Sequence, residues 1–370
     1  MNFDDTEDEA KFRAEAVAFL EKNLEKKDAG AGRADRSRDD FLTRAKAWQK
    51  TKAAGGFAQI TWPKAIGGRG GTPIQQVIWN QEESKFDAPT SPFAIGLGMC
   101  VPTVIAFGSD EHKQRYVPKA LVGDEIWCQL FSEPAAGSDV AGLKTKAVKD
   151  GNGWRVSGSK TLITGGMTSK WLTTAVRTGD KGMGGISLML VDLESEGVSR
   201  TELPKMGWWS SDTATLHFDD VFVPPENLIG MENAGFYGIM ANFNSERLSI
   251  ASQATAAARV CIEDAAAWAQ QRQTFGKRLA DHQVIRHKFA SMAQRVWATT
   301  TFLDNCAWRV MNGESPIAEL SMLKVQATET MEYCAREAMQ ILGGSGFVRG
   351  HRVERIYREV RVMAIGGGSE

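Results

Sequence analysis

In the stretch IMANFNSERLSIASQATAAARVCIEDAAAW, residues 239–268, apolar residues recur in steps of three and four. This spacing places about one side chain per turn on a single face of an α-helix. Every residue on that face is apolar except Glu246. The stretch therefore predicts a long buried helix that carries one acid on its buried face. The face consists of Ile239, Phe243, Glu246, Ile250, Ala254, Ala257, Cys261, Ala265 and Trp268.

Two later stretches repeat this helical spacing and extend the prediction to a bundle. Long helices with such stripes pack nearly antiparallel to one another. The first stripe consists of Ile285, Phe289, Met292, Val296, Thr299, Leu303, Cys306 and Val310. The second consists of Leu320, Leu323, Ala327, Met331, Cys334, Ala338 and Ile341.

The regions before the bundle differ in their periodicity, and together the three regions predict an α+β fold. Residues 1–122 indicate helices separated by Gly and Pro, and residues 123–233 indicate short strands bounded by turn signals. Within the second region, KDGNGW at 149–154 is typical of a hairpin turn. Residues 234–370 are helical again. We therefore expect a helical domain, a β domain and a helical bundle, in that order.

Composition excludes several classes of protein. A chain of 370 residues with 42% hydrophobic and 24% charged residues is typical of a globular protein with two or three packed units. The net charge of −1 gives no field that would favour nucleic acid or an anionic membrane. Five scattered cysteines without a C-x-x-C pair predict a reducing cytoplasm rather than disulfides or zinc. The N-terminus has no apolar signal region, and the apolar run at 94–108 is too short to span a bilayer.

The acid on the buried face allows two interpretations. A buried carboxylate must be paired, neutral or functional, and apolar surroundings raise its pKa towards the range of a general base. In the first interpretation Glu246 is such a base. In the second it pairs with an arginine and only fixes the packing. The adjacent Arg247 is a poor direct partner, because it lies about 100° around the helix.

Five motifs in order resemble the acyl-CoA dehydrogenase family of flavoproteins. They are QLFSEPAAGSDVAGLKTKA at 129–147, WRVSGSKTLITGG at 154–166, SDTATLHFDDVFVP at 211–224, RQTFGKRLADHQ at 272–283 and QILGGSGF at 340–347. The resemblance covers nearly the whole chain. It implies an N-terminal helical domain at 1–122, a barrel-like middle β domain at 123–233 and a C-terminal four-helix bundle at 234–370.

The resemblance also implies a reaction and its partners. Members of this family bind FAD without a covalent bond and remove hydrogens from Cα and Cβ of an acyl-CoA, which yields the trans-2-enoyl thioester. Their usual electron acceptor is an electron-transferring flavoprotein. We therefore expect an acyl-CoA substrate, this acceptor, and a homodimer or homotetramer, with no nucleic acid, membrane or metal.

The family places its catalytic carboxylate at one of two positions, and this chain has only one of them. Many members carry it after an IYRD-like helix near the C-terminus, where IYREVRVMAIGGGSE at 356–370 has Gly367 instead. Relatives that act on branched or long acyl chains, such as isovaleryl- and long-chain acyl-CoA dehydrogenases, carry it on the first long bundle helix before an arginine. That position is Glu246. The resemblance thus implies Glu246 as base, with the Gly367 backbone N–H polarising the thioester carbonyl.

The other site residues are also carried over from the family motifs. Flavin and thioester contacts fall on Gln129, Leu130, Ser132, Gly137, Ser138, Ile163 and Thr164. The FAD of a neighbouring subunit would be reached by Arg272, Thr274 and Phe275, with Gln283, Gln340, Gly343 and Gly344 near its adenine. Substrate contacts fall on Ser138, Asn244, Arg247 and Gly368.

Several of these positions allow another interpretation. Arg272 is also typical of a surface charge, GGSG of a helix end, and Arg247 of a residue that fixes the helix. His282 and His287 are five residues apart, which does not suit a zinc pair.

Two departures from the family pattern leave alternatives open. Leu162 stands where relatives have a tryptophan that packs near the flavin, which affects flavin shielding and the approach of the electron acceptor. Relatives also continue beyond the position of Glu370 with a final helix that closes the FAD site. An acyl-CoA oxidase, another acyl-thioester reaction on the same fold and a non-catalytic subunit of a mixed oligomer are the alternatives. A DNA-repair-like relative is disfavoured, because the chain has no basic patch.

Overall fold

The computed structural model describes residues 5–26 and 37–370, which form two compact units. The first unit contains the described residues up to Pro204 together with Ser210–Ile239, and the second contains Lys205–Trp209 and Met240–Glu370. Residues 1–4 and 27–36 of the predicted helical region lie outside the described residues. Within the described ranges, no helix has both the length and the apolar content to cross a bilayer. The boundaries predicted at 122/123 and 233/234 stay predictions.

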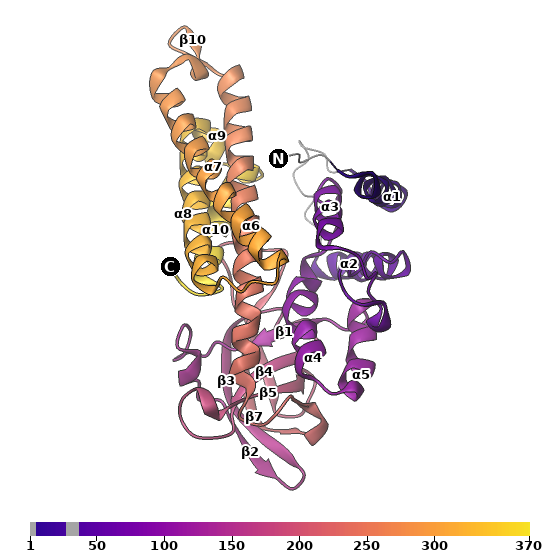
Figure 1. The fold of residues 1–370 in the computed structure, drawn as a ribbon. Helices are drawn as coiled ribbons and strands as arrows, with labels where there is room; N and C mark the ends of the chain where they lie inside the picture. Colours follow the sequence, from indigo (N-terminus) through magenta and orange to yellow (C-terminus); the bar gives the residue numbers. More distant parts are fainter. Residues whose placement is uncertain (1–4, 27–36) are drawn as a thin grey trace. The chain divides into compact units, whose positions relative to one another are not determined.

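The first unit begins with helices, as the Gly/Pro punctuation predicts (Figure 1). Thr6, Thr72 and Ser109 each start a helix with a reciprocal capping box, which satisfies backbone N–H groups of the first turn. The helices are α1 (Glu7–Asn23), α2 (Arg38–Ala54), α3 (Pro73–Glu83), α4 (Val101–Phe107) and α5 (Asp110–Leu121). A π-helix (Gly96–Cys100) leads into α4, and short 3-10 turns occur at Lys64–Ile66 and Ser91–Phe93.

The same unit continues with a mainly antiparallel sheet in the order β6-β7-β3-β2-β4-β5-β8, with β1 parallel to β4. Strands β2 and β3 form the predicted hairpin, which turns at Gly151 with a φ of 58°. The expectation from KDGNGW is therefore confirmed. The strands are β1 (Trp127–Leu130), β2 (Lys146–Asp150), β3 (Gly153–Thr164), β4 (Trp171–Arg177), β5 (Ile186–Asp192), β6 (Val198–Glu202), β7 (Thr213–Val223) and β8 (Leu228–Ile229).

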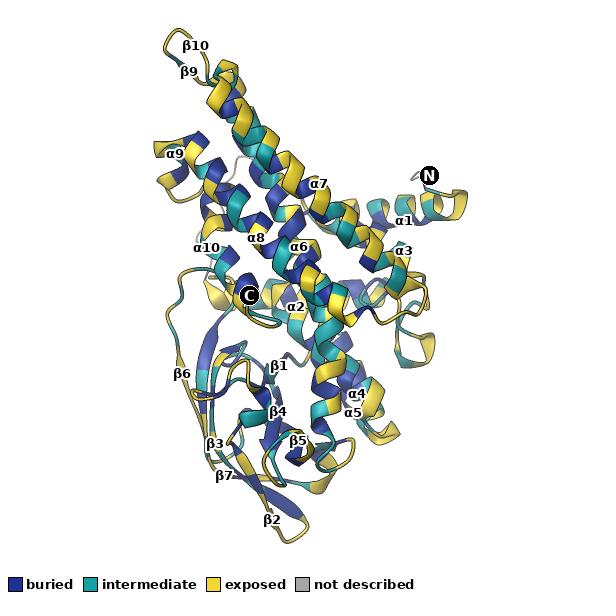
Figure 2. Ribbon diagram, turned by 60° about the vertical axis from the view of Figure 1, so that its left-hand side comes forward, coloured by how far each residue is buried: buried dark blue, intermediate teal, exposed yellow. Residues whose placement is uncertain are grey.

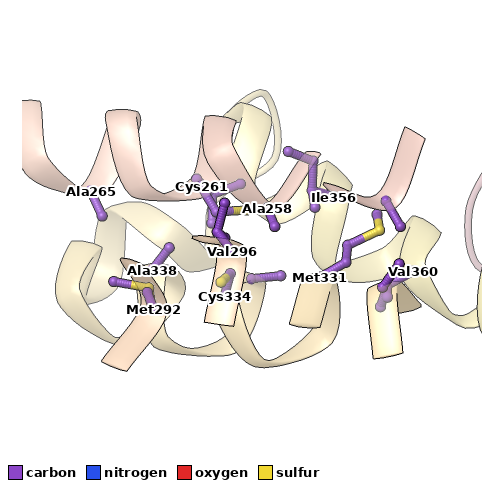
Figure 3. Close-up of a cluster of buried hydrophobic side chains, with 14 of the residues drawn as sticks. Ala258, Cys261, Ala265, Met292, Val296, Met331, Cys334, Ala338, Ile356 and Val360 are labelled. Carbon is purple, nitrogen blue, oxygen red and sulfur yellow. The ribbon is translucent and has the colours of Figure 1, made fainter. Parts of the chain in front are cut away.

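The second unit is a helical bundle with a small hairpin at one end (Figure 1). Its helices are α6 (Gly235–Gln271, which starts in the first unit), α7 (Gln283–Met311), α8 (Ile317–Leu342), the short α9 (Gly344–Phe347) and α10 (Arg352–Ile365). The hairpin consists of β9 (Gln273–Thr274) and β10 (Lys277–Arg278). Figure 2 shows the buried faces of the long helices in dark blue. Figure 3 shows side chains of α6, α7, α8 and α10 meeting in one apolar cluster.

The burial of the long helices tests the predicted stripes. On α8 every residue of the predicted stripe is buried, so that prediction is confirmed. On α6 the prediction is wrong by one position in three places, because Ala251, Ala258 and Ala269 are fully buried. Ile250, Ala257 and Trp268 only pack at the edge of the cluster. The helix is rotated slightly so that its small alanines, and not its larger side chains, face the neighbouring helices.

A buried ion pair shapes the loop after β1. Lys160 on β3 donates from Nζ to Glu133 Oε1 at 2.8 Å and to the Phe131 carbonyl at 3.2 Å. Glu133 also accepts hydrogen bonds from the backbone N–H groups of Lys144 and Thr145, at 2.6 and 2.9 Å. Burial acts to raise the pKa of Glu133, but the Lys160 ammonium and these donors hold it below its usual value. The pair therefore ties both ends of the loop at 131–145 to the sheet.

We predict that Lys160→Met lowers the free energy of unfolding by about 3–5 kcal/mol, because it leaves the Glu133 carboxylate buried without its cation. Urea unfolding followed by circular dichroism measures the loss. Lys149→Met is the matched control, since Lys149 is a surface lysine of the same sheet that pairs with Glu232 at 2.9 Å. The Lys149→Met substitution is expected to lower the free energy of unfolding by less than about 1 kcal/mol. Equal effects of the two substitutions would contradict this account of the loop.

Candidate active site

The carboxyl group of Glu246 on α6 accepts no hydrogen bond from residues 5–26 and 37–370. Its Oε2 atom is inaccessible to water and accepts no hydrogen bond from the described part of the chain. This burial raises the pKa of Glu246 to about 7, although the positive charges of Arg247 and Lys324 act to lower it. A carboxylate in this state suits proton transfer near neutral pH.

Gly367 lies directly against this carboxyl group. A Cβ atom added to Gly367 would lie 3.7 Å from both Cγ and Oε1 of Glu246 and 2.8 Å from Cδ1 of Ile250. The residue has a φ of 66°, which favours glycine. Its backbone N–H donates no hydrogen bond to the described residues. The two positions to which the resemblance assigns the family's base therefore lie next to each other, beside an N–H that donates to none of the described residues.

Arg247 makes its hydrogen bonds within the bundle. Its Nε donates to the Gly367 carbonyl at 3.0 Å, and its Nη1 donates to Ser321 Oγ on α8 at 3.0 Å. Gly368 is next to the same guanidinium, since an added Cβ would lie 3.4 Å from Arg247 Nη2. These contacts support the interpretation that Arg247 fixes the active-site helix and the chain around Gly367. Asn244, two residues before Glu246, is half-buried, and its substrate contact stays a prediction.

Lys324 on α8, whose charge acts on Glu246, was not among the predicted site residues. Its side chain is buried, and Nζ donates to the carbonyls of Ala364 and Gly368 at 2.7 Å each. Burial lowers the pKa of Lys324. A signal was present, because Leu320, Lys324, Ala327 and Met331 follow the same 4-3-4 spacing that singled out Glu246. The predicted stripe used Leu323 instead and passed over the lysine.

The predicted contacts to a neighbouring FAD gather at the other end of the second unit. Thr274 and Phe275 lie in the β9–β10 hairpin, whose turn has φ values of 51° at Phe275 and 78° at Gly276. Phe275 is 97% exposed, and the Arg272 guanidinium forms no ion pair with the described residues. Along α6, Gln271 lies about 37 Å from Glu246 at 1.5 Å per residue. The hairpin and Glu246 are thus too far apart to contact the same part of one ligand.

The remaining predicted adenine contacts lie at the hairpin end as well. Gln283 is the first residue of α7, and Gln340 lies in the last turn of α8. An ion pair between Lys288 and Glu337 joins these two helix ends. Gly343 closes α8 with a φ of 59° and donates its N–H to the Met339 carbonyl at 3.0 Å, while Gly344 starts α9. The interpretation of GGSG as a helix end is therefore confirmed.

The predicted flavin contacts of the first unit come from two neighbouring segments. The Thr161 N–H donates to the Ser132 carbonyl at 3.0 Å, which joins the end of β1 to β3. Between Lys160 and Ile163 the register of β3 shifts, and Leu162 has a φ of 60° with 66% of its surface exposed. Such a bulge turns one side chain out of the sheet. Gly137 and Ser138 are exposed in the loop that the Lys160–Glu133 pair ties down.

These residues fit a flavin dinucleotide. Leu130 and Ile163 are buried and apolar, while Gln129, Ser132, Ser138 and Thr164 have side chains that form no hydrogen bond within the described ranges. Apolar surface with a few uncommitted polar groups is typical of a cofactor site. The planar fork of Arg272 suits a pyrophosphate. Across residues 5–26 and 37–370, no cluster of three or more His, Cys, Asp or Glu side chains could hold a metal ion.

Comparison with known proteins identifies the family. The chain matches the acyl-CoA dehydrogenase N-terminal domain over residues 6–124, the middle domain over 128–221 and the C-terminal domain over 233–370. It belongs to the acyl-CoA dehydrogenase family. Its activity is acyl-CoA dehydrogenation, an oxidoreductase reaction on acyl-CoA thioesters, and the family uses FAD. The expected fold class is confirmed.

Three relatives illustrate the match. Acyl-CoA dehydrogenase AFT10-1 of Alternaria alternata is 38% identical over 291 residues, which cover 75% of this chain and 67% of the relative. The Caffeyl-CoA reductase-Etf complex subunit CarC of Acetobacterium woodii is 34% identical over 317 residues, or 85% of this chain and 84% of the relative. The acyl-CoA dehydrogenase from Geobacillus kaustophilus, known from a crystal structure, is 32% identical in sequence and superposes with a TM-score of 0.86. The match covers 100% of this chain and 96% of that protein's chain.

The contact between Gly367 and Ile250 predicts coupled substitutions. Gly367→Ala should destabilise the protein, because the positive φ alone costs about 1–2 kcal/mol and the new Cβ meets Ile250 Cδ1. Ile250→Val removes that atom, so the double variant should lose less stability than the sum of the two single variants. Urea unfolding of all four proteins measures the coupling. Strict additivity would show that the two residues do not touch.

Proposed function

We propose that this chain converts an acyl-CoA to its trans-2-enoyl-CoA with Glu246 as the base that removes the α-proton. The observation that carries this proposal is the buried Oε2 atom of Glu246, which has no partner among the described residues and lies beside Gly367. A paired structural carboxylate would have its oxygens satisfied. The assignment places the chain with family members whose base lies on the first long bundle helix, which include those acting on branched or long acyl groups.

The α-proton becomes acidic only when the thioester carbonyl is polarised. In our proposal the Gly367 N–H donates to that carbonyl oxygen, and its effect is large because a donor that is already fixed in place needs no reorganisation during the reaction. Glu246 accepts the proton in the same apolar space. FAD, when bound, would supply the acceptor for the hydride that leaves Cβ. Glycine at 366–368 leaves room beside the thioester, which suits branched, bulky or long acyl groups.

The raised pKa sets the pH range of the reaction. Glu246 accepts a proton only when it is ionised, and its pKa is raised to about 7 by burial. The fraction of ionised Glu246 therefore falls as the pH drops through about 7. Proton removal should slow on the acid side of that value and level off above it.

We assign the cofactor and substrate contacts to three sets of residues, one in the first unit and two in the second. In the first unit, Gln129, Leu130, Ser132, Gly137, Ser138, Ile163 and Thr164 would contact the flavin, and Ser138 also the thioester. In the second unit, Asn244, Arg247 and Gly368 would lie near the substrate. Arg272, Thr274, Phe275, Gln283, Gln340, Gly343 and Gly344 would contact the FAD of another copy.

Contribution to the FAD of another copy makes a homodimer or homotetramer the expected assembly. The exposure of Phe275 and the distance of the hairpin from Glu246 support this part of the proposal.

We further infer the electron acceptor and the compartment. An electron-transferring flavoprotein is the expected acceptor, supported by the relative CarC, which is a subunit of a caffeyl-CoA reductase–Etf complex. All five cysteines are buried free thiols, which supports a reducing cytoplasm. The exposed Leu162 marks the position at which the acceptor's approach to the flavin would differ from relatives with tryptophan there.

Glu246→Gln tests the base directly. The variant should keep its yellow FAD and bind acyl-CoA, but its anaerobic flavin bleaching should slow by about 10²–10⁴-fold, because the amide cannot accept the proton. Stopped-flow absorbance measures bleaching with an acyl-CoA selected from short, branched, long and ring-bearing candidates. Glu263→Gln is the control, since it removes an exposed carboxylate from the same helix. Bleaching of the Glu246→Gln variant at the wild-type rate would show that Glu246 is not the base.

A further inference from the structure

The segment that carries Gly367 needs support from outside. Helix α10 ends at Ile365, and the next three residues are glycines with φ values of −65°, 66° and 104°. Glycine has the largest backbone freedom of any residue, so this run does not hold one conformation by itself. The orientation of the Gly367 N–H must therefore come from contacts made by neighbouring helices.

Two cations supply those contacts. Arg247 on α6 donates to the carbonyl of Gly367, and Lys324 on α8 donates to the carbonyls of Ala364 and Gly368. Lys324 therefore bridges the last turn of α10 and the residue after Gly367, and it fixes the chain on both sides of that N–H. Thr328, one turn further along α8, donates to the Glu370 side chain at 2.6 Å.

We propose that Lys324 is a positioning residue for the reaction. By donating hydrogen bonds to the carbonyls of Ala364 and Gly368, it orients the Gly367 N–H towards the thioester carbonyl. This inference rests on the proposed function, in which Gly367 polarises the substrate and Glu246 is the base. Lys324 need not touch the substrate to act in this way.

The environment of Lys324 suits this task better than a purely structural one. Its side chain is only 1% exposed, and both hydrogen-bond acceptors of its ammonium are neutral carbonyls. Burial of a charge is costly, and an apolar residue at this position of α8 would pack without that cost. The end of α10 offers carbonyls that no longer have a helical partner, and these attract a cation. The lysine thus completes a helix end and fixes the glycines beyond it.

The charge of Lys324 also acts on the base. The charged groups around Glu246 are Arg247 on the same helix and Lys324 on α8, and both lower the pKa of Glu246 against the effect of burial. Lys324 in turn faces Arg247 and the Glu370 carboxylate of the terminal segment. Loss of the ammonium removes one of the two stabilising charges, so the pKa of Glu246 should move further up.

The variants Lys324→Gln and Lys324→Arg separate the orientation of the Gly367 N–H from the effect of the positive charge on Glu246. Glutamine keeps hydrogen-bond donors without the charge, and arginine keeps both. For Lys324→Gln we expect retained FAD and an unchanged KM. The rate of flavin bleaching should fall by about 10²-fold, because the Gly367 N–H is misplaced, and the midpoint of its pH dependence should move to higher pH. Lys324→Arg should restore the wild-type pH midpoint and part of the rate. Lys324→Met serves as the neutral variant if the glutamine protein does not accumulate.

A matched control and separate outcomes make the test decisive. Lys288→Gln removes the lysine that pairs with Glu337 at the far end of the bundle, and the pH midpoint should stay unchanged. A neutral Lys324 variant with the wild-type rate and midpoint would overturn the positioning role while leaving Glu246 as base. If Glu246→Gln bleaches normally, the proposed function itself fails, whatever the Lys324 variants show. A lower melting temperature with unchanged rate and midpoint would reduce Lys324 to a packing role.

Discussion

The carboxyl group of Glu246 depends on a balance between burial and nearby positive charge. Burial among apolar side chains of the bundle raises its pKa to about 7, while Arg247 and Lys324 prevent a larger rise. With less burial the group would be a weak base, and without the cations it would stay protonated near neutral pH. Further along α6, small alanines pack against the neighbouring helices of the bundle.

The same two cations link the proposed base to the segment that would polarise the substrate. Arg247 and Lys324 each donate to carbonyls of residues 364–368, so one pair of side chains adjusts Glu246 and orients Gly367. This arrangement explains how a run of three glycines can serve in an active site. It also gives a reason for glycine at 367, because a side chain there would meet Ile250 and the Glu246 carboxyl group.

The sequence predicted the elements with strong periodicity, and its failures have physical causes. The α8 stripe was right at every position, and KDGNGW predicted the hairpin. On α6 the burial is one residue away at three positions, because alanines there allow either neighbour to face the core. Lys324 was missed because Leu323 satisfied the same spacing. Its partners lie 40 and 44 residues along the chain, and helical periodicity carries no information on such contacts. The roles of the site residues stay predictions, since they depend on ligands.

A pH titration of the Glu246 carboxyl group can show whether its pKa is raised as its proposed role as base requires. Protein labelled with ¹³C at its glutamate carboxyl groups can be compared with labelled Glu246→Gln protein by infrared difference spectroscopy as the pH is varied. The difference isolates one carboxyl group. We predict that its protonated band converts to carboxylate with a midpoint near pH 7, as burial requires. A midpoint near the ordinary value of 4.5 would contradict the account, because Glu246 would then be a solvated acid.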